Sequence, residues 1–171
     1  MRRLSGQQLL ETWGLSYFRD ISTFGALNDA TISHLIRSGQ VLELEPGEVL
    51  FEAGDGSDGL FVIVRGQIAF FKYHSGHYAF IRNYHFGENI GFVGMIALHH
   101  RIGRAQADGE TVVVKVPVSL FNELYDRDTQ EFALLLMNLA RDMARGIRAV
   151  DNIIVERSLP VPQQGPPPRI A

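Results

Sequence analysis

Six histidines are the first side chains to consider for chemistry, because imidazole is a common metal ligand and proton carrier. His74-Ser75-Gly76-His77 is typical of a hairpin tip between two strands, and His85 and the pair His99-His100 fall in predicted loops. A metal site on adjoining strands needs closely spaced ligands, such as His-x-His followed by Glu. No such string occurs, so these residues are predicted to be exposed loop histidines, and no metal site is expected.

The nucleophilic and acidic side chains carry no catalytic signature. The chain has no cysteine, which excludes disulfides, thiolate metal sites and cysteine nucleophiles. It contains neither Gly-x-Ser-x-Gly nor a phosphate-binding loop ending in Gly-Lys-Ser/Thr. Asp55 and Asp58 are close in sequence, but they lie among glycines, where aspartate commonly makes backbone hydrogen bonds in turns. We therefore expect no enzyme activity and no bound cofactor.

Length and composition describe one ordinary domain. The chain has 171 residues, of which 46% are hydrophobic and 20% charged, and its net charge is -3. This length and hydrophobic content are enough to bury a core. An isoelectric point near 6.0 gives no overall attraction to nucleic acid or to an anionic membrane. There is no apolar window long enough to span a bilayer, and Met1-Arg2-Arg3-Leu4 lacks the apolar core of a secretion signal. We expect a cytoplasmic protein.

The first two predicted segments are a helical one and a strand-rich one. Residues 1–38 should hold N-terminal helices, with Asn28 or Asp29 as a cap and Gly39 as a stop. Residues 39–127 contain short apolar runs separated by turn residues, which is typical of an antiparallel sandwich or barrel. The runs are Val41–Leu44, Val49–Phe51, Leu60–Val64, Gln67–Tyr73, Tyr78–Tyr84 and Thr111–Val116.

The C-terminal part is predicted to be helical and then proline-rich. A short helix should run from Ser119, its predicted cap, to Tyr125, and a long helix should occupy residues 128–158. The long helix repeats apolar residues at nearly heptad spacing. These are Phe132, Leu136, Leu139, Met143, Ile147, Val150 and Ile154. Residues 159–171 are rich in proline and are predicted to be a disordered tail.

Residues 44–68 carry the most distinctive pattern in the chain. They read LEPGEVLFEAGD followed by GSDGLFVIVRGQI, and Pro46-Gly47 fits a type II turn. This sequence resembles the opening strands of the cyclic nucleotide-binding domain family, which includes catabolite-activator-type regulators, kinase regulatory subunits and gated channels. The resemblance extends over roughly residues 20–157. It implies a mainly β fold with flanking helices: a double-stranded β-helix (a jelly-roll-like β-roll), N-terminal helices and a long C-terminal helix.

The resemblance also implies a place for a ligand. In this family the N-terminus of a short helix late in the roll faces a cyclic phosphate. A glutamate near the start of that helix accepts a hydrogen bond from the ribose, and an arginine about nine residues later pairs with the phosphate. In this chain the corresponding cassette falls between Asn83 and Ala107.

In the favoured alignment Ile90-Gly91-Phe92-Val93-Gly94-Met95 starts the short helix and Arg101 is the phosphate arginine, because the spacing on both sides of Arg101 is then preserved. Phe92 takes the place of the ribose glutamate, and leaving a buried hydroxyl unpaired costs about 1–3 kcal/mol. Ile102 stands where the family prefers a small or hydroxylated residue, which removes another phosphate donor.

Two other alignments stay open. In one, Phe86-Gly87-Glu88 starts the cassette, Glu88 is the ribose glutamate, and the cassette carries an insertion before Arg101. In the other, Arg104 is the phosphate arginine, which shortens the following strand. Glu88 and Arg104 therefore remain candidate ligand contacts.

The long helix has a further implied role. In bacterial regulators of this family the matching helix forms a dimer interface and closes over the base of the ligand. This implies a homodimer or a partner protein, with Asp151 and Asn152 as candidate base contacts. Those regulators continue into a winged helix, whereas only thirteen proline-rich residues follow Ser158, so direct DNA binding is not expected.

These features give one favoured function and two alternatives. The favoured one is a stand-alone regulatory module for signal transduction. It senses a small anionic ligand, a cyclic mononucleotide such as cAMP or cGMP, and signals through its C-terminal helix. The first alternative is a degenerate, ligand-free fold used for dimerisation or protein docking. The second is a metal protein of the cupin type, whose β-roll is similar in shape.

Overall fold

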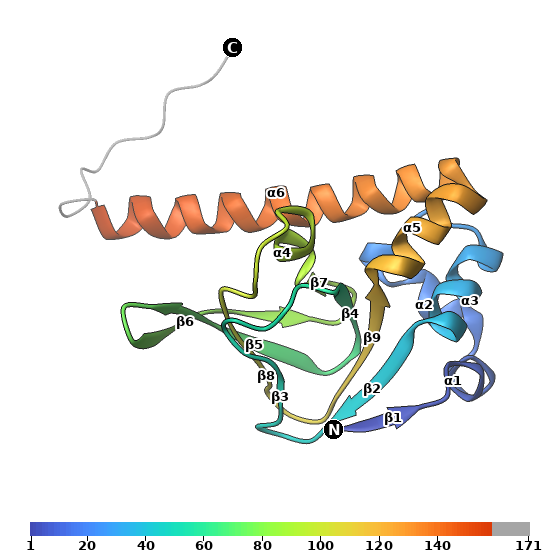
Figure 1. Ribbon diagram of the computed structural model, residues 1–171, viewed down its shortest axis with the longest axis horizontal. Helices are drawn as coiled ribbons and strands as arrows, with labels where there is room; N and C mark the ends of the chain where they lie inside the picture. Colours follow the sequence, from blue (N-terminus) through green and yellow to red (C-terminus); the bar gives the residue numbers. More distant parts are fainter. Residues whose placement is uncertain (159–171) are drawn as a thin grey trace, which may run out of the picture.

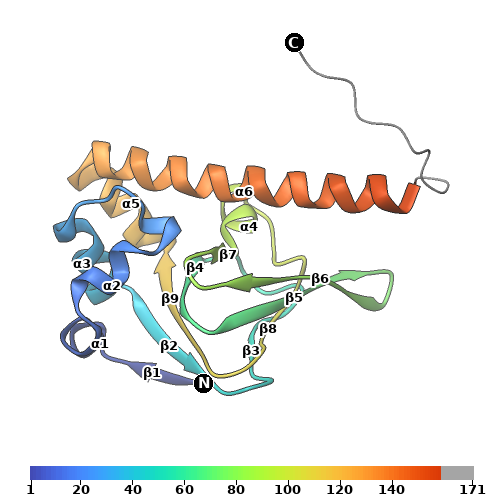
Figure 2. The ribbon, with the colours of Figure 1, turned by 180° about the vertical axis from the view of Figure 1, so that it is seen from behind.

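A computed structural model describes residues 1–158, and the predicted proline-rich tail, residues 159–171, lies outside the described residues (Figures 1 and 2). The N-terminal elements are β1 (Arg2–Leu4), α1 (Gly6–Trp13), α2 (Leu15–Arg19), the 3-10 helix η1 (Ser22–Phe24) and α3 (Asp29–Ser38). The first strands of the roll are β2 (Gln40–Leu44), β3 (Val49–Phe51), β4 (Gly59–Arg65), β5 (Gln67–His74) and β6 (His77–His85). The roll continues with β7 (Asn89–Ile90), α4 (Phe92–Ile96), β8 (Gly103–Ala107) and β9 (Thr111–Pro117). The last helices are α5 (Val118–Arg127) and α6 (Thr129–Ser158).

The strands form two antiparallel sheets that face each other. One sheet has the strand order β1-β2-β9-β4-β7, and the other has the order β3-β8-β5-β6. The N-terminal helices and α5 gather at one end of this roll, and α6 runs along its length in both views (Figures 1 and 2). The predicted fold, a mainly β jelly-roll-like roll with flanking helices, is confirmed.

Alternation along β4 divides the core into two layers. Leu60, Val62 and Val64 face the helices and join the cluster that contains Leu35, Leu120 and Leu139. Phe61 and Ile63 face the other way and fill the space between the two sheets. Because successive side chains of a strand point to opposite faces, β4 can be apolar throughout and still serve both layers.

The N-terminal segment agrees with the sequence in its helix ends and departs from it at β1. Asn28 caps α3 by accepting from the Thr31 N–H at 2.8 Å, and Gly39 ends that helix, as predicted. However, residues 1–38 are not only helical, because Arg2–Leu4 pairs with β2. The Arg2 guanidinium reaches Glu43 across the pair, with Nε 2.9 Å from the carboxylate. A three-residue edge strand with charged side chains has no apolar run by which to recognise it.

The predicted cap of the short helix was wrong. The helix α5 begins at Val118, directly after Pro117, and no side chain caps it, so Ser119 lies inside the first turn. The Val118 N–H donates to the carbonyl of Asp58 at 3.0 Å. The loop before β4 thus satisfies one of the four N–H groups that the first turn leaves without a partner inside the helix.

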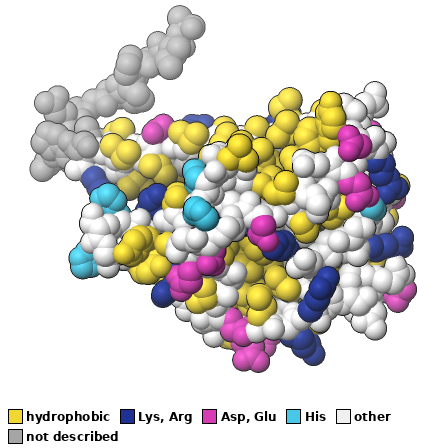
Figure 3. All heavy atoms as spheres, in the orientation of Figure 1, with side chains coloured by type: hydrophobic (Ala, Val, Ile, Leu, Met, Phe, Trp, Pro, Cys, Tyr) yellow, Lys and Arg dark blue, Asp and Glu magenta, His cyan; other side chains and the backbone are white. Residues whose placement is uncertain are grey.

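The helix α6 is anchored at its start and exposed towards its end. Asp128 accepts from the N–H groups of Gln130 and Glu131 at 3.1 Å, which caps the helix. Leu135 and Leu139 are buried against the rest of the molecule. From Met143 onward the large apolar side chains of α6 are exposed, and hydrophobic side chains are visible along this edge in Figure 3.

Candidate functional site

The short helix α4 begins where the favoured alignment places it. Gly91 precedes Phe92 with φ +91°, a left-handed conformation that glycine adopts without strain. A Cβ at this position would also lie 2.3 Å from Nη1 of Arg101. Glycine is therefore required here both by the backbone turn and by the close approach of the arginine.

Arg101 points into the molecule and binds carbonyl oxygens. Its Nη1 donates to the Gly91 carbonyl at 2.8 Å, and its Nη2 donates to the Gly59 carbonyl at 2.6 Å. The guanidinium lies over the rings of Phe51 and Phe61, at 4.6 and 5.6 Å from their centroids. The residue is 5% exposed, and its Nε has no hydrogen-bond partner among the described residues.

The same arginine holds the loop before β4 through its backbone. The Arg101 N–H donates to the Asp55 carbonyl, and the Gly54 N–H donates to the Arg101 carbonyl, both at 2.8 Å. Burial lowers the pKa of Arg101, while Asp58 and Asp55 act against that shift. The Asp58 carboxylate lies 3.9 Å from Nη2 of Arg101 and pairs more closely with Lys115, at 2.5 Å. Arg101 thus joins residues 54–59 to the start of α4.

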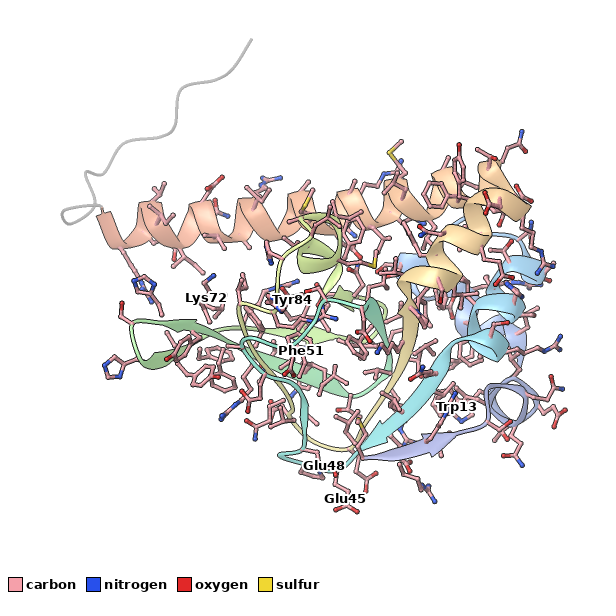
Figure 4. The ribbon with its side chains drawn as sticks, in the orientation of Figure 1. Trp13, Glu45, Glu48, Phe51, Lys72 and Tyr84 are labelled. Atoms are coloured by element: carbon pink, nitrogen blue, oxygen red, sulfur yellow. The ribbon has the colours of Figure 1, made fainter. Side chains whose placement is uncertain are left out.

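An open cavity of about 380 Å³ lies between the roll and α6. Its walls come from β5, β6, the junction of β7 with α4, and the middle of α6. The lining residues are Phe70, Ile81, Arg82, Tyr84, Asn89, Ile90, Gly91, Phe92, Val93, Leu139, Asp142, Met143, Gly146, Ile147, Val150 and Asp151. Figure 4 shows Tyr84 in the layer under α6, and Phe51 further from that helix. The walls are mostly apolar, as in typical small-molecule sites.

Four of the ten predicted ligand contacts line this cavity. Gly91, Phe92 and Val93 contribute the start of α4, and Asp151 lies on α6. Phe92 is buried and also packs with the helical core cluster, so its ring closes the wall between cavity and core.

The other predicted contacts lie elsewhere. Arg104 donates to Glu52 at 2.8 Å and lies over Tyr78, at 4.6 Å from its ring centroid. Gly94 faces Ser57, and Ile102 and Asn152 are exposed. The structure therefore does not bring Arg101, Arg104 and Asn152 together at the cavity.

Glu88, the ribose glutamate of the second alignment, has both carboxylate oxygens engaged. One oxygen accepts from Nη1 of Arg82 at 2.9 Å, and the other accepts from the His85 N–H at 2.8 Å. Glu88 does not line the cavity. Its geometry is that of a residue that closes the turn after β6 and holds an arginine in place.

Arg82 lines the cavity and was missed from the sequence. Its guanidinium lies over the ring of Tyr84, 3.7 Å from the centroid. Burial acts to lower its pKa, but Tyr84 and Glu88 outweigh burial, and the pKa is raised. A signal was present, because Arg82 and Tyr84 are two residues apart in a predicted strand and so share a face.

Asp142 connects α6 to the roll at the edge of the cavity. Its Oδ2 accepts from Asn89 at 2.6 Å and from Thr23 at 3.3 Å, and its Oδ1 pairs with Arg145. One turn earlier, Asn138 donates to the Gly25 carbonyl at 2.7 Å. These contacts fix the first half of α6 on η1 and β7.

The loop and hairpin histidines lie at the surface of the described part of the chain. His74, His77, His85 and the pair His99-His100 are exposed, and residues 1–158 contain no cluster of three or more His, Asp or Glu side chains placed to hold a metal ion. Over the same residues, none of the helices has the length and apolar character needed to cross a membrane.

Comparison with known proteins identifies the roll. The family model for the cyclic nucleotide-binding domain matches residues 41–128. Among curated proteins, the lysophospholipase NTE1 of Chaetomium globosum is 27% identical over 120 residues, which are 70% of this chain and 8% of that protein. The chain spans only about a tenth or less of the length of the curated relatives it matches.

Solved structures show the same fold. A cyclic nucleotide-binding domain from Methylobacillus flagellatus superposes with a TM-score of 0.80 at 18% identity, covering 93% of this chain and 90% of that one. The regulatory subunit of a cAMP-independent protein kinase A from Trypanosoma cruzi, bound to guanosine, gives 0.66 at 16% identity, covering 90% and 53%. The two structures agree with this chain in fold, and the family match over residues 41–128 shows that the chain belongs to the cyclic nucleotide-binding domain family.

Proposed function

We propose that this chain is a regulatory module that binds a small organic ligand in the cavity under α6, and that a cyclic mononucleotide is the first ligand to test. The observation that carries the proposal is the cavity itself, about 380 Å³ in volume, at the start of α4. Small-molecule sites typically measure about 300–1,000 Å³ and combine apolar walls with a few polar groups. A base and ribose would fit between the aromatic side chains of the roll and the apolar side chains of α6.

The position of the cavity also suggests how binding would be read out. Met143, Ile147 and Val150 of α6 face β5, β6 and the start of α4 across it. A ligand that contacts both walls favours the position of α6 in which both contacts are made. The free half of α6, beyond Asp142, would transmit that preference to a partner or to a second copy of the chain.

The similar proteins support a regulatory role for this chain, but they do not support any catalytic activity. The NTE1 proteins are named lysophospholipases, but this chain matches only a small part of them, so we propose regulation and not lipase activity. The Trypanosoma cruzi neighbour holds guanosine, which supports a nucleoside-sized ligand for a roll of this kind.

The test is calorimetric titration of the purified chain with cAMP, cGMP and a cyclic dinucleotide. Saturable heat is expected for at least one of them, and it should be lost in Gly146→Leu, since Gly146 lines the cavity and no atom lies within 4 Å of an added Cβ. Ala144→Leu, on the same helix but outside the cavity lining, is the matched control and should bind normally. Silence at millimolar concentrations of all three, with the chain folded, contradicts the proposal.

A second candidate function is dimerisation or docking without a ligand. It is favoured by apolar side chains of α6 that are exposed and do not line the cavity, among them Met137, Ile153 and Val155. Light scattering after size exclusion would detect a dimer, and Val155→Asp should convert it to a monomer. A monomer in the unsubstituted chain at tens of micromolar would contradict this candidate.

A further inference from the structure

The cavity under α6 contains one basic side chain among its lining residues, Arg82. We propose that Arg82, and not Arg101, binds the anionic group of the ligand. This inference rests on the proposed function, because it requires a ligand in the cavity. It extends the proposed function by naming the residue that binds the negative charge of the ligand and the orientation of the ligand in the cavity.

Arg101 is poorly placed to receive an anion. Both of its Nη atoms donate to carbonyl oxygens, it is buried, and it does not line the cavity. To reach a phosphate it would have to release both carbonyl oxygens; the Gly91 oxygen would keep the Met95 N–H as a donor at 3.3 Å, but the buried Gly59 carbonyl would lose its arginine donor. Losing that hydrogen bond inside the molecule opposes the exchange.

Arg82 is already held in a binding geometry. Its side chain is 30% exposed, the ring of Tyr84 supports one face of the guanidinium, and Glu88 holds Nη1 at 2.9 Å. A guanidinium carries five N–H donors in a rigid plane, so one pairing does not exhaust it. An arginine fixed by stacking and by one ion pair loses little side-chain freedom when it binds a second anion.

The charges around the cavity give the ligand a direction. Asp142 and Asp151 both lie on the α6 wall, whereas Arg82 lies on β6 opposite them. Asp142 is engaged with Asn89 and Arg145, and Asp151 is exposed. A negative group is therefore disfavoured beside α6 and favoured beside β6. The chemistry that fits is a single phosphate or carboxylate on an apolar or aromatic body, with the body against Ile147 and Val150.

The test compares a charged ligand with an uncharged one of the same base. The chain, Arg82→Gln and Arg101→Gln are each titrated with cGMP and with guanosine. Because a hydrogen bond to a charged group contributes about 1.5–3 kcal/mol, Arg82→Gln should weaken cGMP binding about ten- to a hundredfold and leave guanosine within about twofold. A merely structural role for Arg82 would weaken both ligands alike.

Two further variants sharpen the result. Glu88→Gln keeps an acceptor oxygen that holds Nη1 of Arg82 but removes the negative charge beside the bound anion, so cGMP should bind a few times more tightly and guanosine should not change. Arg82→Lys keeps the charge without the stacked plane, so its affinity for cGMP should lie between those of the chain and Arg82→Gln. Each variant is accepted only if its thermal unfolding stays cooperative.

The outcomes separate the two proposals. Selective loss of cGMP binding in Arg101→Gln, with normal binding in Arg82→Gln, overturns this inference and leaves the proposed function standing. Equal weakening of both ligands in Arg82→Gln also overturns it. If the unsubstituted chain binds neither ligand and none of the cyclic nucleotides, the proposed function fails, and this inference fails with it.

Discussion

Two arginines lie near the start of α4, and they differ in what surrounds them. Arg101 is buried and donates through both Nη atoms to the protein's own carbonyl oxygens, while Arg82 lines an open cavity and is paired with a carboxylate. The first resembles the family's ligand residue in spacing, and the second does not. The comparison shows that the position of an arginine in a motif does not determine its partner, because its guanidinium can donate to a nearby backbone carbonyl and not to a phosphate.

The largest effect is expected on stability, from removing Arg101. Arg101→Ala removes one donor from each of the Gly91 and Gly59 carbonyls and leaves a void beside Phe51, so the free energy of unfolding should fall by about 3 kcal/mol. Arg104→Ala is the control, because Arg104 and Glu52 form an exposed pair, and such pairs contribute little to stability. Denaturant titration of both variants measures the difference, and equal losses would contradict an internal role for Arg101.

A smaller loss is expected at the glycine that Arg101 touches. Gly91→Ala adds a Cβ 2.3 Å from Nη1 in a left-handed backbone, so it should destabilise by about 2 kcal/mol. Gly76→Ala has a similar φ, +85°, but meets open space, and should cost about 1 kcal/mol. The comparison is read from urea midpoints. If Gly91→Ala is no worse than Gly76→Ala, the close packing of Arg101 on Gly91 is not present in solution.

A local effect is expected where α6 is fastened. Asp142→Ala removes the acceptor for Asn89 and Thr23, at a cost of about 1 kcal/mol, and should loosen α6 around the cavity. Amide exchange should rise in the middle of α6 and stay unchanged in its first turns, where Asn138 still holds Gly25. Asp151→Ala serves as the control and should leave exchange unaltered, since Asp151 is exposed.

The smallest effect concerns pH and the other arginine of the cassette. The hydrogen bond from Arg104 lowers the pKa of Glu52 below its usual 4.5. A carboxyl with a lowered folded pKa stabilises the fold above its unfolded pKa, and that contribution is lost as pH falls through the folded pKa. Stability measured below about pH 4.5 should therefore fall less steeply in Glu52→Gln than in the unsubstituted chain. Parallel pH profiles would show that the pair has no influence.

Much of the fold could be predicted because its local signals agree with one another. Continuous apolar runs mark β4 and β9, Pro46-Gly47 forms the expected turn with Gly47 at φ +85°, and Asn28 caps α3. The strand β8 was missed because its inward side chains are small: Ala105 and Ala107 fill little space and produce no apolar run. The prediction that Ser119 caps α5 was wrong, because the helix begins one residue earlier, where the Val118 N–H donates to the carbonyl of Asp58 in a distant loop.

The site was less predictable than the fold. The start of α4 followed from the glycines, but the partners of Arg101 are carbonyls of residues 10 and 42 positions away, which no local pattern reports. Arg82 lies in a strand of mostly apolar and aromatic residues, and no motif in the sequence identified it as a site residue. Its role emerges only when α6 covers that face and Tyr84 and Glu88 fix its plane.

The most direct test of this account follows the two guanidinium groups themselves during ligand addition. In a spectrum that resolves the arginine Nε–H signals of the chain, assigned with Arg82→Lys and Arg101→Lys, titration with cGMP should shift the Arg82 signal progressively and leave the Arg101 signal in place. A shift of the Arg101 signal with Arg82 unchanged would contradict the assignment of the anion to the cavity under α6.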